Sequence, residues 1–306
     1  MQVYELLDSA KVSGKAVCEL FAPFSEIGIK SSTQTIKGSE GSTDFVRILV
    51  PGTNGKSKGG KAPTLGIIGR LGGIGARPSR IGLVSDADGA IAAIASALKL
   101  AYMAQNGDLL AGDVIITTHI CPNAPTKPHK PVDFMGSPVD MGDMNKYEVD
   151  AACDAILSID TTKGNNLINH KGVAISNTVK EGWILRASED LLRLLEYASG
   201  QRPVMFPISM QDITPYGNGA YHLNSILQPA IATSAPVVGV AITAAGVVPG
   251  CATGASHEVD IALAVRFALE VAKDYGKGLA SFYDAEEFEL LRGKYGDMKV
   301  LQSMGK

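Results

Sequence analysis

The chain has 306 residues, of which 45% are hydrophobic and 19% are charged, and its formal net charge is -3. This length and hydrophobic content are sufficient for a large folded core. Binding to a phosphate backbone by counterion release needs an excess of basic residues, and this chain has none, so we expect no nucleic-acid partner.

Cysteine usage and the N-terminal segment predict a cytoplasmic protein. The four cysteines are far apart in the sequence and form no CxxC pair, and the first residues lack the basic and apolar regions of a signal peptide. The longest apolar run, residues 234–255, is interrupted by Gly, Ala and Pro. It predicts a buried strand followed by a loop, so we also expect no membrane partner.

The first third of the chain predicts helices, then strands, then a longer helix. Apolar residues at helical spacing predict one or two helices over 3–24. Alternating or short apolar runs predict strands over 33–41, 45–52, 64–73 and 80–85. A period of 3.6 then predicts a helix over 90–105.

Strands and helices continue to alternate in the rest of the chain. We predict strands over 112–125, 153–166, 173–185, 202–209 and 235–243, and helices over 188–200, 219–233 and 256–276. Ser188 is the expected N-cap of its helix, and 122–146 is a long polar surface loop that we interpret as a possible lid. The alternation predicts one α/β domain over 1–306, with a three-layer α/β/α architecture and a mixed, mostly parallel central sheet.

Polar side chains follow several of the predicted buried strands. Asp86, His119 and Asp160 each end an apolar run, and His257 follows another just before the last predicted helix. Ligands of parallel sheets bind at the carboxyl ends of the strands, so we expect these side chains to gather at one edge. Carboxylates and imidazoles together favour a divalent metal such as zinc or manganese, which would activate a water molecule.

Each of these residues also has a simpler interpretation. Asp86 and Asp88 stand where acidic residues stabilise the start of a helix. Asp160 can begin a turn, and Ser256 can cap the last helix next to His257. A metal site and a set of capping residues therefore both remain open.

Three further features of the sequence lie outside this set of strand-end residues. Cys121 lies two residues after His119, which allows a cysteine hydrolase with His119 as the base. The glycine-rich segment 69–78 matches no phosphate-binding motif, and we interpret it as a tight loop. Asn218 and His222 are candidates to line a substrate pocket.

Several of these segments, in this order, resemble the cocatalytic zinc exopeptidase superfamily of aminopeptidases and acylase-type amidohydrolases. SDADGAIAAI resembles the bridging-aspartate segment of that superfamily and AILSIDTT its later metal-binding strand. GASHEVDIA resembles its terminal histidine segment and KVSGKAVCELFAPF its opening helix. The resemblance implies a zinc-exopeptidase-like fold, with Asp86 bridging two metals, Asp160 a ligand of one and His257 a ligand of the other.

The chain departs from that superfamily at two places. Arg70 and Gly72 stand where the first histidine ligand and its following acid would be, and His119 and Cys121 stand where the Glu-Glu pair would be. Arg70 is a permanent cation and cannot bind a metal. The whole chain also resembles an uncharacterised bacterial family known as a domain of unknown function.

Two functional hypotheses follow. The first is a metal-dependent hydrolase of a small peptide or N-acyl amino acid, with one or two ions of zinc or another divalent metal and with His119 as the base. The metal ligands are then drawn from Asp86, His119, Asp160 and His257. The second is a non-catalytic protein in which Arg70 and the glycine-rich loop hold a small anionic ligand. The predicted substrate-binding residues are Arg70, Asp88, Cys121, Asn218 and His222, and we expect a homo-oligomer.

Overall fold

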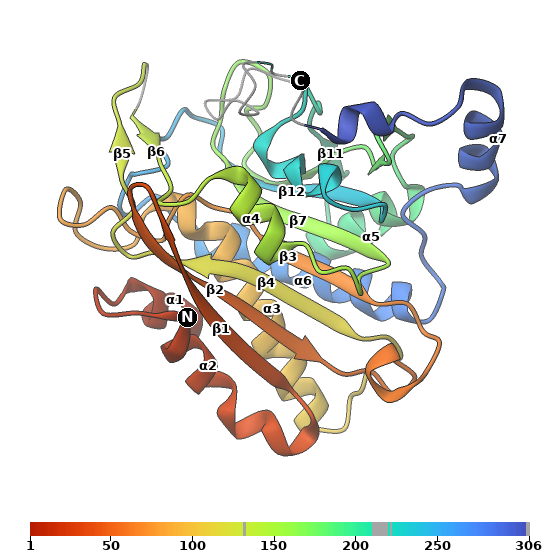
Figure 1. Ribbon diagram of the computed structural model, residues 1–306, viewed down its shortest axis with the longest axis horizontal. Coiled ribbons are helices and arrows are strands. Elements are labelled where there is room, and N and C mark those ends of the chain that lie inside the picture. The colour runs from red at the N-terminus through yellow and green to blue at the C-terminus, as the bar shows by residue number, and fades with distance from the viewer. Residues whose placement is uncertain (131–132, 210–219, 221, 304–306) are drawn as a thin grey trace.

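A mixed ten-stranded sheet forms the centre of the computed structural model, which describes residues 1–130, 133–209, 220 and 222–303 (Figure 1). Its strand order is β1-β2-β4-β3-β7-β12-β8-β11, and β9 and β10 lie beside this path. The central strands β4, β3, β7 and β12 are parallel, whereas β1, β2 and β8 run antiparallel to their inner neighbours.

The strands of this sheet have the following bounds: β1 Lys30–Gly38, β2 Gly41–Val50, β3 Leu65–Gly69, β4 Val114–Ile120, β7 Ala155–Thr162, β8 Gly172–Ile175, β9 Val179–Lys180, β10 Trp183–Ile184, β11 Val204–Met205 and β12 Val237–Thr243. Four of the runs predicted from hydrophobic pattern, over 64–73, 112–125, 153–166 and 235–243, contain the four parallel strands. These strands are buried on both faces, and such strands are continuous apolar runs in sequence.

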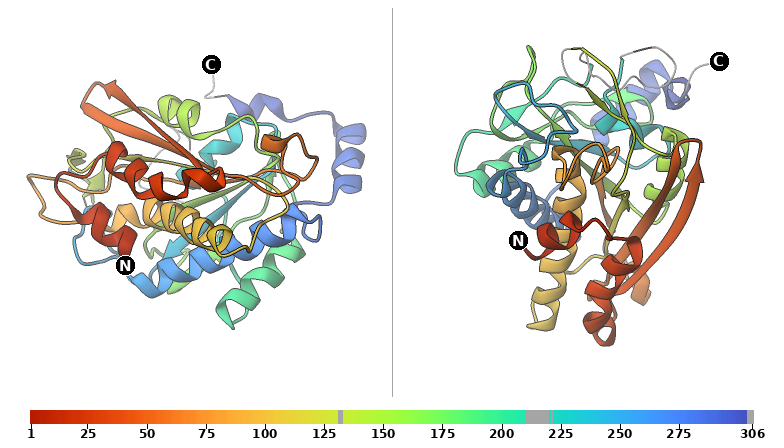
Figure 2. Two further views of the ribbon diagram at one scale, coloured as in Figure 1. Left: turned by 90° about the horizontal axis from the view of Figure 1, so that it is seen from below. Right: turned by 90° about the vertical axis from the view of Figure 1, so that its left-hand side faces the viewer.

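Helices cover both faces of the sheet (Figure 2). The larger core cluster contains side chains of α1 (Gln2–Asp8), α2 (Gly14–Phe21), α3 (Asp88–Gln105), α5 (Glu189–Ser199) and α6 (Glu258–Gly276). A second cluster joins the opposite face to the 3-10 helix η4 (Ser225–Ile231), which also contacts α4 (Met141–Glu148). The three-layer architecture with a mixed sheet and a parallel centre is thereby confirmed.

Local structure departs from the sequence prediction in five segments. The strand expected over 173–185 divides into β8, β9 and β10. Residues 80–85 form no strand, because the chain runs from β3 through a loop and the short 3-10 helix η3 (Ser85–Ala87) into α3. The strand expected over 202–209 shortens to β11. In the range 219–233, where a helix was expected, η4 is a 3-10 helix with Pro229 inside it, and residues 219 and 221 lie outside the described part of the chain. The helix α7 (Ala285–Tyr295) follows α6, so the predicted last helix is not the last.

The remaining elements are short. The loop over 122–146 contains β5 (Thr126–Lys127), β6 (Phe134–Met135) and the start of α4, and its role as a lid stays a prediction. Short 3-10 helices lie at η1 (Ala22–Ile27), η2 (Lys56–Lys58) and η5 (Lys299–Gln302). Ser188 is the N-cap of α5 as predicted, because its hydroxyl accepts a hydrogen bond from Leu191 N.

Helix α3 lies close to the sheet because its inward residues are small. A Cβ atom on Gly89 would lie 2.5 Å from the carbonyl oxygen of Arg70 and 2.6 Å from that of Ile159. Within the described ranges, residues 85–105 form the one helical stretch that is long and apolar enough to cross a membrane. Of its most apolar 18-residue segment, 72% is buried inside the protein. The apolar character of this helix is therefore explained by its position in the core.

Candidate functional site

A buried chain of charged side chains ends at His119, near the carboxyl end of β4. The Nδ1 atom of His119 lies 2.7 Å from Oε1 of Glu148, and Nη1 of Arg70 donates to Oε2 of Glu148 at 2.6 Å. The side chains of His119 and Glu148 are 0% exposed and that of Arg70 is 3% exposed. We call these three residues the Arg70–Glu148–His119 chain.

The Arg70–Glu148–His119 chain determines which nitrogen of His119 carries the hydrogen. Glu148 is paired with a permanent cation and is therefore a carboxylate, which can only accept hydrogen bonds. Nδ1 must then be the donor to Glu148, so that Nε2 carries the lone pair whenever the imidazole is in its neutral form. Nε2 is buried and has no hydrogen-bond partner within the part of the chain that the structure describes.

The parallel pairing of β3 and β4 brings Arg70 and His119 together. Ile68 of β3 pairs with Thr117 of β4. Arg70 lies two positions after Ile68, and His119 lies two positions after Thr117. Glu148 is the last residue of α4, and its backbone carbonyl accepts a hydrogen bond from the hydroxyl of Thr117 at 2.7 Å. Two further α4 side chains contact the Arg70 guanidinium, namely Asn145 and Met141.

Asp86 accepts hydrogen bonds from the loop that follows β3. Its Oδ2 accepts from the backbone N–H of Gly72 at 2.5 Å and of Gly73 at 3.0 Å. Burial raises the pKa of Asp86 to about 6, although these hydrogen bonds and the nearby His119 favour the charged form. Helix α3 has Ala87 as its N-cap, without a side-chain cap. The interpretation of Asp86 as a helix cap is therefore wrong.

Asp88 is neutralised by a lysine that the sequence analysis did not select. Its Oδ2 lies 2.8 Å from Nζ of Lys163 and accepts from the hydroxyl of Thr161 at 3.2 Å. Burial raises the pKa of Asp88, and Lys163 acts in the opposite direction. Asp160 is 8% exposed and accepts from the backbone N–H of Thr161 at 2.7 Å, which agrees with its position at a strand end.

The other predicted residues lie in different surroundings. His257 is exposed and is the N-cap of α6, where Ser256 was the expected cap. His222 is half-buried, and Asn218 lies outside the described residues. Cys121 is 1% exposed, its sulfur contacts Asn123, and burial raises its pKa, which favours the unreactive thiol.

The donor set does not fit the metal centre predicted from sequence. Within residues 1–130, 133–209, 220 and 222–303, no three His, Cys, Asp or Glu side chains are grouped to hold a metal ion. Asp86 uses Oδ2 for two backbone N–H groups, and Asp88 is paired with Lys163. The positive charge beside Asp88 is thus a side chain of the protein, Lys163.

Sequence reasoning missed Glu148 and Lys163. Glu148 is the last residue of a short polar helix, and nothing local separates it from a solvent-exposed acid. Lys163 directly follows β7, so the rule that selected Asp160 at the end of that strand also applied to Lys163.

Comparisons with known proteins find similar solved structures and one family. A mutant leucine aminopeptidase from tomato matches with a TM-score of 0.49 and 12% sequence identity, over 88% of this chain and 60% of the aminopeptidase. The chain thus spans about 60% of the length of that protein. No curated protein matches in sequence. The model of the family "Protein of unknown function (DUF1177)" matches residues 34–305, and the chain belongs to this family.

Proposed function

We propose that this protein is a hydrolase that cleaves an amide bond of a small peptide or N-acyl amino acid, with His119 as the general base. The observation that carries the proposal is the buried Arg70–Glu148–His119 chain, which leaves Nε2 without a partner in the described structure. A carboxylate on Nδ1 both orients an imidazole and stabilises the imidazolium that forms when Nε2 takes a proton.

The proposed reaction balances as a simple hydrolysis. Nε2 of His119 removes a proton from a water molecule as its oxygen attacks the carbonyl carbon of the amide. The carbon–nitrogen bond then breaks, and the leaving nitrogen receives a proton. Asp86 is our candidate for that proton donor, since burial raises its pKa to about 6.

Arg70 is a positioning residue in this proposal. Its guanidinium donates to Glu148 and is 3% exposed, so it acts on His119 through the carboxylate. The binding-protein hypothesis requires Arg70 to contact a ligand directly, but this guanidinium is almost sealed from solvent. Because the donor set does not fit a metal centre, no step of the proposed reaction uses a metal.

Amine release from a panel of dipeptides and N-acetyl amino acids tests the proposal. Full-length wild type is compared with His119→Gln and with His129→Gln, a matched change at an exposed histidine. We expect His119→Gln to lower kcat by roughly 10²- to 10⁴-fold, the usual contribution of a general base. His129→Gln should keep wild-type activity, and circular dichroism should show that both variants are folded.

Three outcomes would overturn the proposal. The first is His119→Gln with wild-type activity, and the second is wild type that cleaves no member of the panel. The third is wild type that loses activity in EDTA and regains it only with zinc. That third result would restore the metal-dependent mechanism predicted from sequence.

A further inference from the structure

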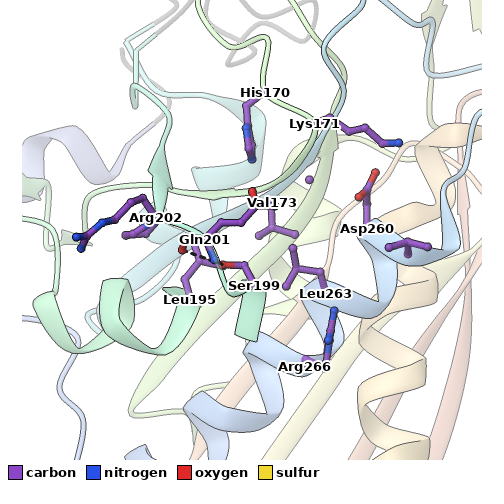
Figure 3. Close-up of a pocket in the computed structure, with 13 residues that line it drawn as sticks. His170, Lys171, Val173, Leu195, Ser199, Gln201, Arg202, Asp260, Leu263 and Arg266 are labelled. Carbon is purple, nitrogen blue, oxygen red and sulfur yellow. Dashed lines mark hydrogen bonds between the residues drawn. The ribbon is translucent and has the colours of Figure 1, made fainter. Parts of the chain in front are cut away.

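A polar pocket lies between α5, α6 and the start of β8 (Figure 3). Its volume is about 170 Å³, and its lining includes the apolar side chains of Val173, Leu195 and Leu263. Sites for drug-sized ligands have volumes of roughly 300–1,000 Å³, so this pocket suits a smaller molecule. None of the residues of the Arg70–Glu148–His119 chain lines it.

Three basic side chains surround this pocket. Lys171 and Arg266 are exposed, and neither lies within 4.0 Å of a carboxylate in the described part of the chain. Arg202 pairs with Glu196 at 3.2 Å, but that arginine side chain is 90% exposed. Free guanidinium and ammonium groups around a concave site favour an anionic group such as a carboxylate.

Asp260 adds an opposite charge to the same pocket. It belongs to the first turn of α6, is 7% exposed, and extends from the helix toward Lys171 in Figure 3. Its Oδ2 is buried and has no hydrogen-bond partner among the described residues. A buried acceptor without a donor is costly, so this carboxylate calls for a donor from a ligand.

We propose that this pocket binds the zwitterion of a free α-amino acid with an aliphatic side chain such as that of leucine. The carboxylate of the ligand pairs with Lys171 and Arg266, its ammonium group donates to Asp260, and its side chain packs against Leu195 and Leu263. An inorganic anion would match the basic residues but would be repelled by Asp260. A simple amine would match Asp260 but would be repelled by the basic residues.

Isothermal titration of the full-length protein with four probes tests this charge pattern. L-leucine carries both charges, L-leucinamide only the ammonium group, 4-methylpentanoate only the carboxylate, and inorganic phosphate a different anion. We expect L-leucine to bind at least tenfold more tightly than each of the other three. Binding of phosphate or 4-methylpentanoate as tight as that of leucine, or no leucine binding at millimolar concentration, overturns the proposal.

Variants locate the binding in this pocket. Arg266→Gln and Asp260→Asn should each weaken leucine binding at least tenfold. Lys277→Gln, which removes a basic side chain just after the end of the same helix, should leave the affinity unchanged. Arg266 is exposed, so its variant should fold even if Asp260→Asn does not. Unchanged affinity in Arg266→Gln overturns the proposal.

The His119→Gln variant separates this inference from the proposed hydrolase. We expect it to bind leucine with wild-type affinity, because His119 does not line the pocket. Loss of leucine binding in His119→Gln, with binding retained in Arg266→Gln, would place leucine at the other site and overturn the inference. Lack of hydrolysis by wild type would leave the leucine measurements unaffected.

Discussion

Lys163 and Asp88 form an ion pair that is almost sealed from solvent. Nζ and Oδ2 are 2.8 Å apart, and the two side chains are 4% and 0% exposed. We predict that Lys163→Met lowers the free energy of unfolding by about 3–5 kcal/mol, because it leaves Asp88 buried without a counter-charge. Urea unfolding of the purified variant measures the loss.

A double variant supplies the control for this prediction. Lys163→Met combined with Asp88→Asn removes both charges, so it should be more stable than Lys163→Met alone. A Lys163→Met variant within 1 kcal/mol of wild type would contradict the burial of this pair.

Glu148→Gln should destabilise the protein for a related reason. It keeps the shape of the side chain but leaves the buried guanidinium of Arg70 without its partner, at a cost of about 3–5 kcal/mol. Arg47 and Asp150 form a matched pair with side chains that are 40% and 20% exposed. Asp150→Asn should therefore cost only about 0–1 kcal/mol in the same urea experiment. Equal losses of unfolding free energy in Glu148→Gln and Asp150→Asn would contradict the burial of the Arg70–Glu148 pair.

The raised pKa of Asp86 predicts how stability depends on pH. Its pKa rises from 3.8 to about 6 because burial disfavours the carboxylate. Between about pH 4 and pH 6 the folded state then holds more protons than the unfolded state, so the free energy of unfolding falls as pH rises. The contribution of this one group is up to about 3 kcal/mol, from about 1.4 kcal/mol for each pKa unit.

Asp86→Asn isolates that contribution. Asparagine can still accept from the N–H groups of Gly72 and Gly73 but carries no charge. The stability of the variant relative to wild type should therefore increase from pH 4 to pH 7 in denaturant titrations. Parallel curves for the two proteins would show that Asp86 has an ordinary pKa.

Gly89→Ala should disturb the docking of α3 on the sheet. The added methyl group would lie 2.5 Å from the Arg70 carbonyl oxygen, and a backbone atom cannot move aside like a flexible side chain. We predict a loss of about 1–3 kcal/mol or more, as for other overpacked cores. Gly293 in α7 has no atom within 4 Å of an added Cβ, so Gly293→Ala should be neutral or stabilising. Similar urea midpoints for the two variants would contradict the tight docking.

The cysteines should react slowly with iodoacetamide in the folded protein. Cys121, Cys153 and Cys251 are buried, whereas Cys18 is half-buried. Burial also raises the pKa values of Cys18, Cys121 and Cys153, which lowers the fraction of reactive thiolate at neutral pH. Mass spectrometry should find Cys18 modified first, and all four modified in urea. Rapid labelling of Cys121 with loss of activity would instead support the cysteine hydrolase.

Local pattern located the strand ends because strands buried on both faces have a distinct sequence signature. His119 and Asp160 lie at the carboxyl ends of β4 and β7, where the apolar runs predicted them. Local pattern failed for Asp86, which resembles a capping acid in its own segment. Its actual donors are the N–H groups of Gly72 and Gly73, which lie 14 and 13 residues earlier in the chain.

The sequence by itself determined the order of the elements, the parallel centre of the sheet and the polar residues at two strand ends, because these depend on periodicity within single segments. The tertiary structure decided which charges neutralise one another. Arg70 and Glu148 are 78 positions apart and Asp88 and Lys163 are 75 apart, so these pairs exist only once the sheet order and the docking of α4 are set. Those pairs neutralise Glu148, which sequence reasoning missed, and Asp88, which it had placed among the substrate-binding residues.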